Sequence, residues 1–267
     1  MAILDYQAIK FDGTSSENRL DALTVEEGLQ VKVNGEPLMI TMRSPGNDAE
    51  LVRGLLHSED ILPTINEDVE IIVESKNKGV VPVVNVNIPE DKLGDGYKNS
   101  RSFLSVSSCG ICGQTELQEV KGELEKKGKF NPLELKHMFE LMDGKQKTFR
   151  KSGGSHAAAA FDEKGEMICV MEDIGRHNAV DKVIGTLLLK KQLNRAFAIT
   201  VSGRISYEIV MKAFRAKIPV LAAVSAPSSL AVDYSKELGI TLFGFCRGEN
   251  ATCYSNMHRV NAIDQTK

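Results

Sequence analysis

The second half of the sequence repeats one unit, which consists of an apolar segment, a polar loop with glycine or serine, and an amphipathic segment. The apolar segments begin near residues 167, 196, 220 and 240. Helical spacing of apolar side chains is clearest at positions 180, 183, 184, 187 and 188. Such alternation predicts a mostly parallel sheet with helices on its faces. Right-handed crossovers would bring every strand-to-helix loop to one edge of that sheet, where ligands of such folds bind.

The first half predicts a smaller α+β roll, and we place the domain boundary so that residues 1–128 form one domain and residues 129–267 the α/β domain. An Asn34-Gly35 turn is expected to join two strands of the roll. Asn47, with Glu50 three residues later, predicts a helix that starts with a capping box. Nothing in this part indicates chemistry, and we expect His57 on the surface of that helix.

Composition excludes several classes of function. The chain has 267 residues with 33 basic and 36 acidic side chains, and its net charge of −3 gives no global positive field for nucleic acid. No apolar run approaches the roughly 20 residues that a membrane-spanning helix needs. The N-terminus lacks the basic start and long apolar stretch of a secretory signal. We therefore expect a cytoplasmic protein without nucleic-acid or membrane partners.

One pair among the five cysteines has a spacing with chemical meaning. The segment Ser108-Cys109-Gly110-Ile111-Cys112-Gly113 is a C-x-x-C motif with glycine on either side. Three chemistries use this spacing: half of a zinc site, a redox dithiol at the start of a helix, or an accessible thiolate that carries sulfur. Flanking glycines favour a functional loop over packing. Cys169, in an apolar strand, is expected to be a small buried hydrophobe.

A zinc site is the least favoured of these chemistries. The sequence contains no second C-x-x-C, and Cys246 and Cys253 are seven residues apart. Zinc deaminases combine a C-x-x-C with His-x-Glu, but here His156 is followed by two alanines, so the proton-shuttling glutamate is missing. We expect neither a structural metal nor a deaminase centre.

Anion-binding character concentrates at the loops of the α/β half. Asp173-Ile174-Gly175-Arg176-His177-Asn178 runs from a strand end into a helix N-terminus, where backbone amides and the helix dipole attract phosphate. Arg204 and Arg247 follow later strands, so three arginines are predicted at the shared edge. Alternatively, Asp173 only caps the helix and Arg176 is solvated, while His156 is either a core histidine or a ligand-binding one.

Taken in order, these motifs resemble the formate dehydrogenase accessory sulfurtransferases, the FdhD/NarQ family, along nearly the whole chain. The similarity rests on residues 33–38, 50–56, 108–113, 153–157, 172–182, 202–206, 225–229 and 244–247. It implies a three-layer αβα C-terminal domain like that of cytidine deaminases, and a cytoplasmic homodimer.

The same resemblance implies a sulfurtransferase that accepts persulfide sulfur from a cysteine desulfurase. The sulfur would pass to the molybdenum, or tungsten, of a bis(molybdopterin guanine dinucleotide) cofactor before that cofactor enters the catalytic subunit of formate dehydrogenase. Cys109 would carry the persulfide, with Cys112 second. The residues expected to bind the cofactor are Gly154, His156, Asp173, Gly175, Arg176, His177, Asn178, Ser202, Gly203, Arg204, Phe245, Cys246, Arg247, Gly248, Glu249 and Asn250.

Two alternatives to sulfur transfer stay open from the residues alone. A cofactor chaperone would bind and shield the cofactor without moving sulfur. A dithiol reductase would need both Cys109 and Cys112 and would form a disulfide between them. Cys246, within the last binding segment, is also a possible additional sulfur acceptor.

Overall fold

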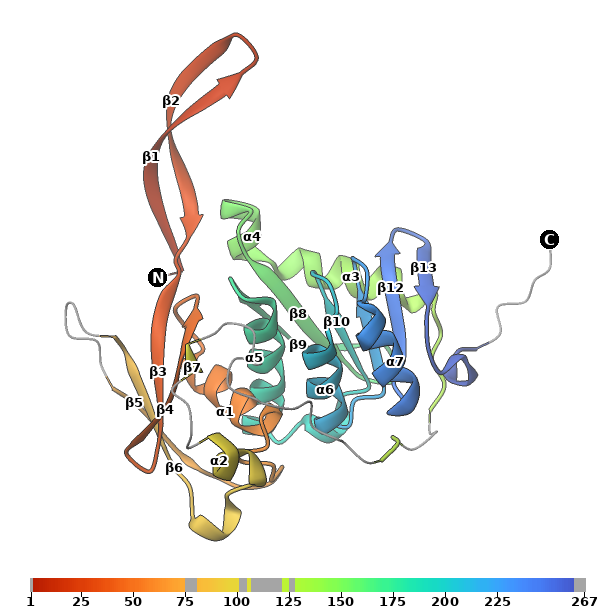
Figure 1. Ribbon diagram of the computed structural model, residues 1–267. Coiled ribbons are helices and arrows are strands. Elements are labelled where there is room, and N and C mark those ends of the chain that lie inside the picture. The colour runs from red at the N-terminus through yellow and green to blue at the C-terminus, as the bar shows by residue number, and fades with distance from the viewer. Residues whose placement is uncertain (1, 75–80, 101–104, 107–121, 125–127, 262–267) are drawn as a thin grey trace, which may run out of the picture.

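A computed structural model describes residues 2–74, 81–100, 105–106, 122–124 and 128–261 of the chain. It contains a five-stranded sheet from the first part of the sequence and a six-stranded sheet from the second, with a long two-stranded ribbon that projects from the first part (Figure 1). The mixed α/β class predicted from the sequence is confirmed.

The five-stranded sheet has the order β5-β6-β3-β4-β7. Its strands are β3 (Glu27–Val33), β4 (Glu36–Arg43), β5 (Glu70–Glu74), β6 (Val83–Asn87) and β7 (Ser105–Val106). Asn34 and Gly35 both have positive φ, 53° and 84°, and form the expected hairpin turn between β3 and β4. The helices of this part are α1 (Asp48–Ser58) and α2 (Asp95–Ser100).

The helix α1 does not begin with the predicted capping box. Asn47 occupies the N-cap in the left-handed conformation, with φ 57°, and its side chain makes no capping hydrogen bond. A capping residue normally has extended backbone, which directs its side chain at the first-turn amides. The neighbouring Asp48 instead binds the guanidinium of Arg43, at 2.9 Å.

The projecting ribbon consists of β1 (Ile3–Asp12) and β2 (Ser15–Thr24). All ten positions pair in an unbroken antiparallel register, from Ile3 with Thr24 to Asp12 with Ser15. The sequence analysis made no prediction for this element.

The six-stranded sheet has the order β13-β12-β11-β10-β8-β9. Its strands are β8 (His156–Phe161), β9 (Met167–Asp173), β10 (Ala198–Val201), β11 (Val220–Ala223), β12 (Thr241–Arg247) and β13 (Asn250–Cys253). The strands β10, β11 and β12 are parallel, and β8 pairs antiparallel with both β10 and β9. Therefore β9 runs in the same direction as β10–β12, although a reversed strand separates it from them.

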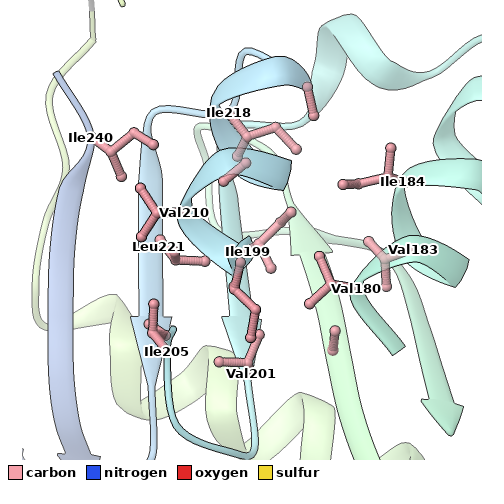
Figure 2. Packing of buried hydrophobic residues seen from close by; sticks show 14 of the residues in the cluster. Val180, Val183, Ile184, Ile199, Val201, Ile205, Val210, Ile218, Leu221 and Ile240 are labelled. Atoms are coloured by element: carbon pink, nitrogen blue, oxygen red, sulfur yellow. The ribbon is translucent and has the colours of Figure 1, made fainter. Parts of the chain in front are cut away.

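Helices cover both faces of this sheet and give three layers (Figure 1). One face packs against α5 (Arg176–Leu189), α6 (Tyr207–Arg215) and α7 (Ser229–Glu237), and the other against α3 (Glu134–Lys145), which α4 (Lys147–Ser152) follows. Figure 2 shows Val180, Val183 and Ile184 of α5 directed at Ile199 and Val201 of β10. The expected helical stripe is thus the face of α5 that packs against the sheet, and the remaining residues from His177 to Leu188 are buried as well. The specific likeness to cytidine deaminases and the boundary at residue 128 stay predictions.

The two sheets are joined through a close contact between α1 and α5. A methyl group placed on Gly54 would lie 1.9 Å from the carbonyl oxygen of Asp181, and one on Gly185 would lie 1.8 Å from that of Glu50. Only glycine permits this approach of two helix backbones. The surface position expected for His57 is wrong, because α6 covers this face of α1. Its side chain is buried, with Nε2 3.2 Å from the carbonyl oxygen of Arg215.

None of the helices in the described ranges has the length and apolar character that crossing a bilayer requires.

Candidate functional site

Five loops of the described chain meet at one edge of the six-stranded sheet. The strands β9, β10, β11 and β12 end there, and β8 begins there because it runs in the opposite direction. The register places His156 opposite Asp173, and Ala158 opposite Val201. The predicted common edge of the strand-to-helix loops is therefore confirmed. The prediction of a mostly parallel sheet is wrong, because three of the five strand pairings in this sheet are antiparallel.

The helix α5 presents its N-terminus at this edge. Gly175 is the N-cap residue and has no side chain to accept the first amide protons, and the first turn contains no acidic residue. The first-turn amides of a helix have no partner within the helix, and its dipole favours negative charge at this end. These groups suit a phosphate or carboxylate ligand.

Arg176 and His156 meet beside this N-terminus. A methyl group on Gly203 would lie 3.2 Å from His156 Nδ1 and 3.6 Å from Arg176 Cδ, so Gly203 packs against both side chains. The Nε of Arg176 is buried and has no hydrogen-bond partner among the described residues. A buried guanidinium N–H without an acceptor is unusual, and an anionic oxygen would satisfy it with a charge-assisted bond.

The charge state of His156 follows from this neighbourhood. Burial lowers the pKa of the His156 imidazole below its usual 6.5, the positive charge of Arg176 lowers it further, and Asp173 acts in the opposite direction. The ring is therefore neutral at pH 7. It can donate or accept a hydrogen bond beside the fixed charge of Arg176.

Asp173 organises the loop from inside. Its carboxylate is fully buried, forms a 2.7 Å ion pair with Lys182, and accepts hydrogen bonds from the backbone N–H of Ser44 and Gly175 at 3.1 and 2.8 Å. The side chain of Asn178 donates to it at 3.1 Å and to the carbonyl oxygen of Met42 at 2.7 Å. These contacts give Asp173 and Asn178 the role of holding the loop, not of reaching a ligand.

Ser44 connects the first part of the chain to this loop with all of its polar groups. Its N–H donates to Asp173, its hydroxyl accepts from the N–H of Ile174 at 3.0 Å, and its carbonyl accepts from Lys182 at 3.1 Å. Each bond joins residues about 130 positions apart in the sequence. Sequence reasoning missed Ser44, and no local pattern around it indicates this role.

Two further predicted residues support the edge. His177 is buried, with its Nε2 3.0 Å from the hydroxyl of Ser206. The hydroxyl of Ser202 accepts from the N–H of Ala157 at 2.9 Å. Arg204 is exposed, and Gly154 lies in the loop before β8.

The last predicted segment forms the turn between β12 and β13. Phe245 has a left-handed φ of 54° and is 45% exposed, while Cys246 points inward and is buried. Arg247 donates from Nε to the carbonyl oxygen of Val224 at 3.2 Å. Glu249 is exposed and pairs with Lys136 of α3. Between this turn and α3 lies a cavity of about 260 Å³, lined by Leu135, Lys136, Phe139, Glu140, Asp143, Cys246 and Gly248.

The three described cysteines are poor nucleophiles. Burial raises the pKa of Cys246 to about 12 and that of Cys169 to about 11, and it also raises the pKa of Cys253. Thiols with such pKa values are protonated at neutral pH, and the thiolate is the reactive form. Cys246 is therefore disfavoured as a sulfur acceptor. Cys109 and Cys112 lie outside the described residues.

The strand β7, which precedes the cysteine motif in the sequence, runs toward the candidate edge. It pairs parallel with β4, with Ser105 opposite Met39 and Val106 opposite Ile40. The strand β4 continues from Ile40 to Arg43 and then to Ser44, which binds Asp173. Because the two strands are parallel, Val106 is the end of β7 that lies toward that contact.

In the described residues, no group of three or more His, Cys, Asp or Glu side chains is arranged to hold a metal ion. Since Cys109 and Cys112 lie outside these residues, the expected absence of a structural metal stays a prediction.

Fold and site together define a mixed α/β protein whose sheet edge and helix N-terminus form a candidate anion-binding site. A model of the FdhD/NarQ family matches residues 24–261, and the chain belongs to this family. The match begins at the last residue of β2, so nearly all of the ribbon lies outside it.

Relatives from bacteria and archaea are similar over most of their length. A sulfur carrier protein FdhD of Mycobacterium tuberculosis is 42% identical over 259 residues, which cover 91% of this chain and 92% of the relative. One from Sulfolobus acidocaldarius is 40% identical over 242 residues, covering 90% and 92%. The crystal structure of a putative formate dehydrogenase accessory protein from Desulfotalea psychrophila superposes with a TM-score of 0.76 at 19% identity. It covers 98% of this chain and all of that one, which shows a shared fold.

Proposed function

We propose that the protein is a sulfurtransferase of the cytoplasm that carries sulfur on Cys109 and serves formate dehydrogenase. Relatives about 40% identical to it are called sulfur carrier proteins, and the Desulfotalea protein of the same fold is called a formate dehydrogenase accessory protein. Among the cysteines, the three described ones are held as thiols, which leaves the glycine-flanked pair Cys109 and Cys112 as candidates for the reactive thiolate.

The uptake step is a thiolate exchange. The Cys109 thiolate attacks the terminal sulfur of a persulfide on a cysteine desulfurase, a new S–S bond forms, and the old S–S bond breaks. The electron pair of the broken bond leaves with the desulfurase cysteine as a thiolate. No external oxidant or reductant is consumed, because the transferred sulfur keeps its oxidation state.

The acceptor is proposed to be the molybdenum or tungsten bis(molybdopterin guanine dinucleotide) cofactor, which is substrate here. Its phosphates would lie at the N-terminus of α5 against Arg176, with His156 beside them. The buried, unsatisfied Nε of Arg176 and the close packing of Gly203 fit an anionic group at this place. Arg204, Arg247 and the exposed Phe245 would contact the more distant parts of the cofactor. The catalytic subunit of formate dehydrogenase would then receive it.

The observation that carries this proposal is the parallel pairing of β7 with β4. The strand β7 ends at Val106, three residues before Cys109 in the sequence, and it runs in the same direction as β4, whose end binds the anion loop through Ser44. An extended chain advances by roughly 3.3 Å per residue, so Cys109 is tied within about 10 Å of Val106. This pairing supports the proposal that Cys109 acts together with the anion loop.

Mass spectrometry after incubation with a cysteine desulfurase and cysteine tests sulfur uptake. We expect a gain of roughly 32 Da per sulfur atom on Cys109, lost on reduction. Cys109→Ala should abolish the adduct, and Cys246→Ser should keep it. An adduct that maps to Cys246 would contradict the assignment.

Activity measurements on variants of Cys109 and Cys112 separate the alternatives. A cofactor chaperone without sulfur transfer would activate formate dehydrogenase even when both Cys109 and Cys112 are replaced by alanine. A dithiol reductase would accumulate a Cys109–Cys112 disulfide during turnover and would lose activity with either single replacement.

A further inference from the structure

The strand β5 is a free edge of the five-stranded sheet. It stands at one end of the strand order β5-β6-β3-β4-β7, at the margin of the molecule (Figure 1), and no described strand pairs with its outer side. Its five residues pair with β6 in a regular antiparallel register. Soluble proteins usually protect such an edge with lysine, proline or a bulge, and β5 contains none of these. The edge is therefore open to a further strand.

The hydrogen bonds of β6 decide which backbone groups of β5 face this edge. The carbonyl oxygens of Pro82, just before β6, and of Val86 accept hydrogen bonds from β3 at 2.9 and 3.0 Å. Successive residues of a strand direct their N–H and C=O groups to opposite sides, so the odd-numbered residues of β6 face β5. The register pairs them with the even-numbered residues of β5. Ile71 and Val73 therefore direct their N–H and C=O groups to the free edge.

The side chains of β5 are apolar in the middle and acidic at both ends. Ile72 and Val73 are 41% and 50% exposed and lie on opposite faces of the sheet. Glu70 and Glu74 are exposed on the same face as Ile72. Residues 67–74 contain four acidic side chains and no basic one. The first two pair with lysines of other elements, which leaves the charges of Glu70 and Glu74 uncompensated among the described residues.

We propose that β5 binds an extended basic segment of another protein, which adds a strand to the sheet. Main-chain hydrogen bonds to Ile71 and Val73 provide affinity, and the side chains provide specificity. A complementary segment has lysine or arginine opposite Glu70 and Glu74 and apolar residues between them, because opposite charges attract across a ladder. A second copy of this chain does not fit, since in-register pairing of two β5 strands places glutamate opposite glutamate at both ends. The inference is independent of the sulfur-transfer proposal.

Fluorescence anisotropy with the purified full-length protein and a labelled synthetic peptide tests this edge. The probe has lysine-valine-threonine-valine-lysine at its centre, and the control peptide has the same composition with its lysines adjacent. We expect saturable binding of the probe, roughly tenfold tighter than binding of the control, because only the probe matches both glutamates. Added salt should weaken this binding, since the charge pairs are exposed.

Methylation of the peptide backbone tests the main-chain pairing without any change to the protein. In an added antiparallel strand, the two valines of the probe exchange hydrogen bonds with Ile71 and Val73. N-methylation of both valines should therefore abolish binding. N-methylation of the threonine is the matched control, because its N–H points away from β5, and this peptide should bind like the probe.

The double variant Glu70→Lys/Glu74→Lys tests the charge pattern. It should bind the probe at least about tenfold more weakly than wild type and should prefer a peptide with glutamate in place of both lysines. The matched control is Glu163→Lys/Glu166→Lys, which changes the net charge equally at exposed positions outside β5. It should bind the probe like wild type.

A wild type that does not bind the probe would overturn the proposal. Equal binding of the control peptide, or of the peptide methylated at both valines, would also overturn it, because charge alone would then explain the binding. Equal binding of a peptide with glutamine in place of both lysines would show an edge that accepts strands of any charge, which contradicts a basic partner. If the lysine variant does not fold, the peptide series on the wild type still decides between these outcomes.

Discussion

Replacement of Arg176 by alanine tests the anion site most directly. Its Nε is buried without a partner, and the side chain lies at the N-terminus of α5. A charge-assisted hydrogen bond from such a group contributes roughly 1.5–3 kcal/mol, so guanosine diphosphate should bind Arg176→Ala about 10- to 150-fold more weakly than wild type. Guanosine diphosphate serves as a mimic of half of the dinucleotide cofactor. Isothermal titration calorimetry measures the change.

A second signature of the same variant comes from His156. Because the charge of Arg176 contributes to the lowered pKa of His156, that pKa should rise toward 6.5 in Arg176→Ala, although burial keeps part of the shift. In the wild type, protonation of His156 adds a positive charge, so binding of guanosine diphosphate should strengthen as the pH falls through the lowered pKa of this ring. Histidine titration by NMR reads the pKa directly.

The matched control is Arg195→Ala, because Arg195 precedes β10 at the opposite edge of the sheet and is 56% exposed. It should bind guanosine diphosphate like wild type. Arg204→Ala and Arg247→Ala should lose less than Arg176→Ala, since contacts of exposed charges are weaker. Sulfur loading of Cys109 should survive all of these changes. Wild-type affinity in Arg176→Ala would show that the phosphate site is not at this helix N-terminus.

Three further variants test the framework of the site. Gly185→Ala should lower the free energy of unfolding, measured in urea titrations, by roughly 2 kcal/mol or more. The added methyl group would clash with the backbone of Glu50, which costs about 3 kcal/mol. The better helix propensity of alanine offsets only about 1 kcal/mol of this cost. Burial lowers the pKa of His57 to about 4, so the unfolded chain binds a proton at a higher pH than the folded chain does. The free energy of unfolding of the wild type should therefore fall by up to roughly 3 kcal/mol between pH 6.5 and 4. The variant His57→Gln should not show this loss. Ser44→Ala should lower the free energy of unfolding by about 1 kcal/mol and also weaken guanosine diphosphate binding. Ser58 is equally buried, and Ser58→Ala should lower the free energy of unfolding by a similar amount without affecting binding.

The sequence determined the local elements of the α/β half. Apolar segments separated by glycine- and serine-containing loops predicted the strands β9 to β12 and the helices after β9, β10 and β11, because strand and helix periodicity are properties of neighbouring residues. The Asn34-Gly35 hairpin was predictable for the same reason, since its positive φ angles follow from the two residue types. The order of the motifs indicated the family.

Pairings between distant residues were decided only by the tertiary structure. The reversed strand β8 lies between β9 and β10, and nothing local to the alanines after His156 specifies that place. His57 was expected at the surface because its own helix gives no sign that α6 covers it. Asn47 missed its capping role because Gly46 and Asn47 both take positive φ.

The same distinction holds within the site. Sequence placed Asp173 and Arg176 together in one loop, but their opposite roles depend on Ser44 and Lys182, which surround Asp173 and leave Arg176 at the edge. A buried carboxylate is stable only when it is paired and hydrogen bonded, and its partners here come from both halves of the chain. The sequence therefore determined which residues form the loop, and long-range hydrogen bonds decided which of them face a ligand.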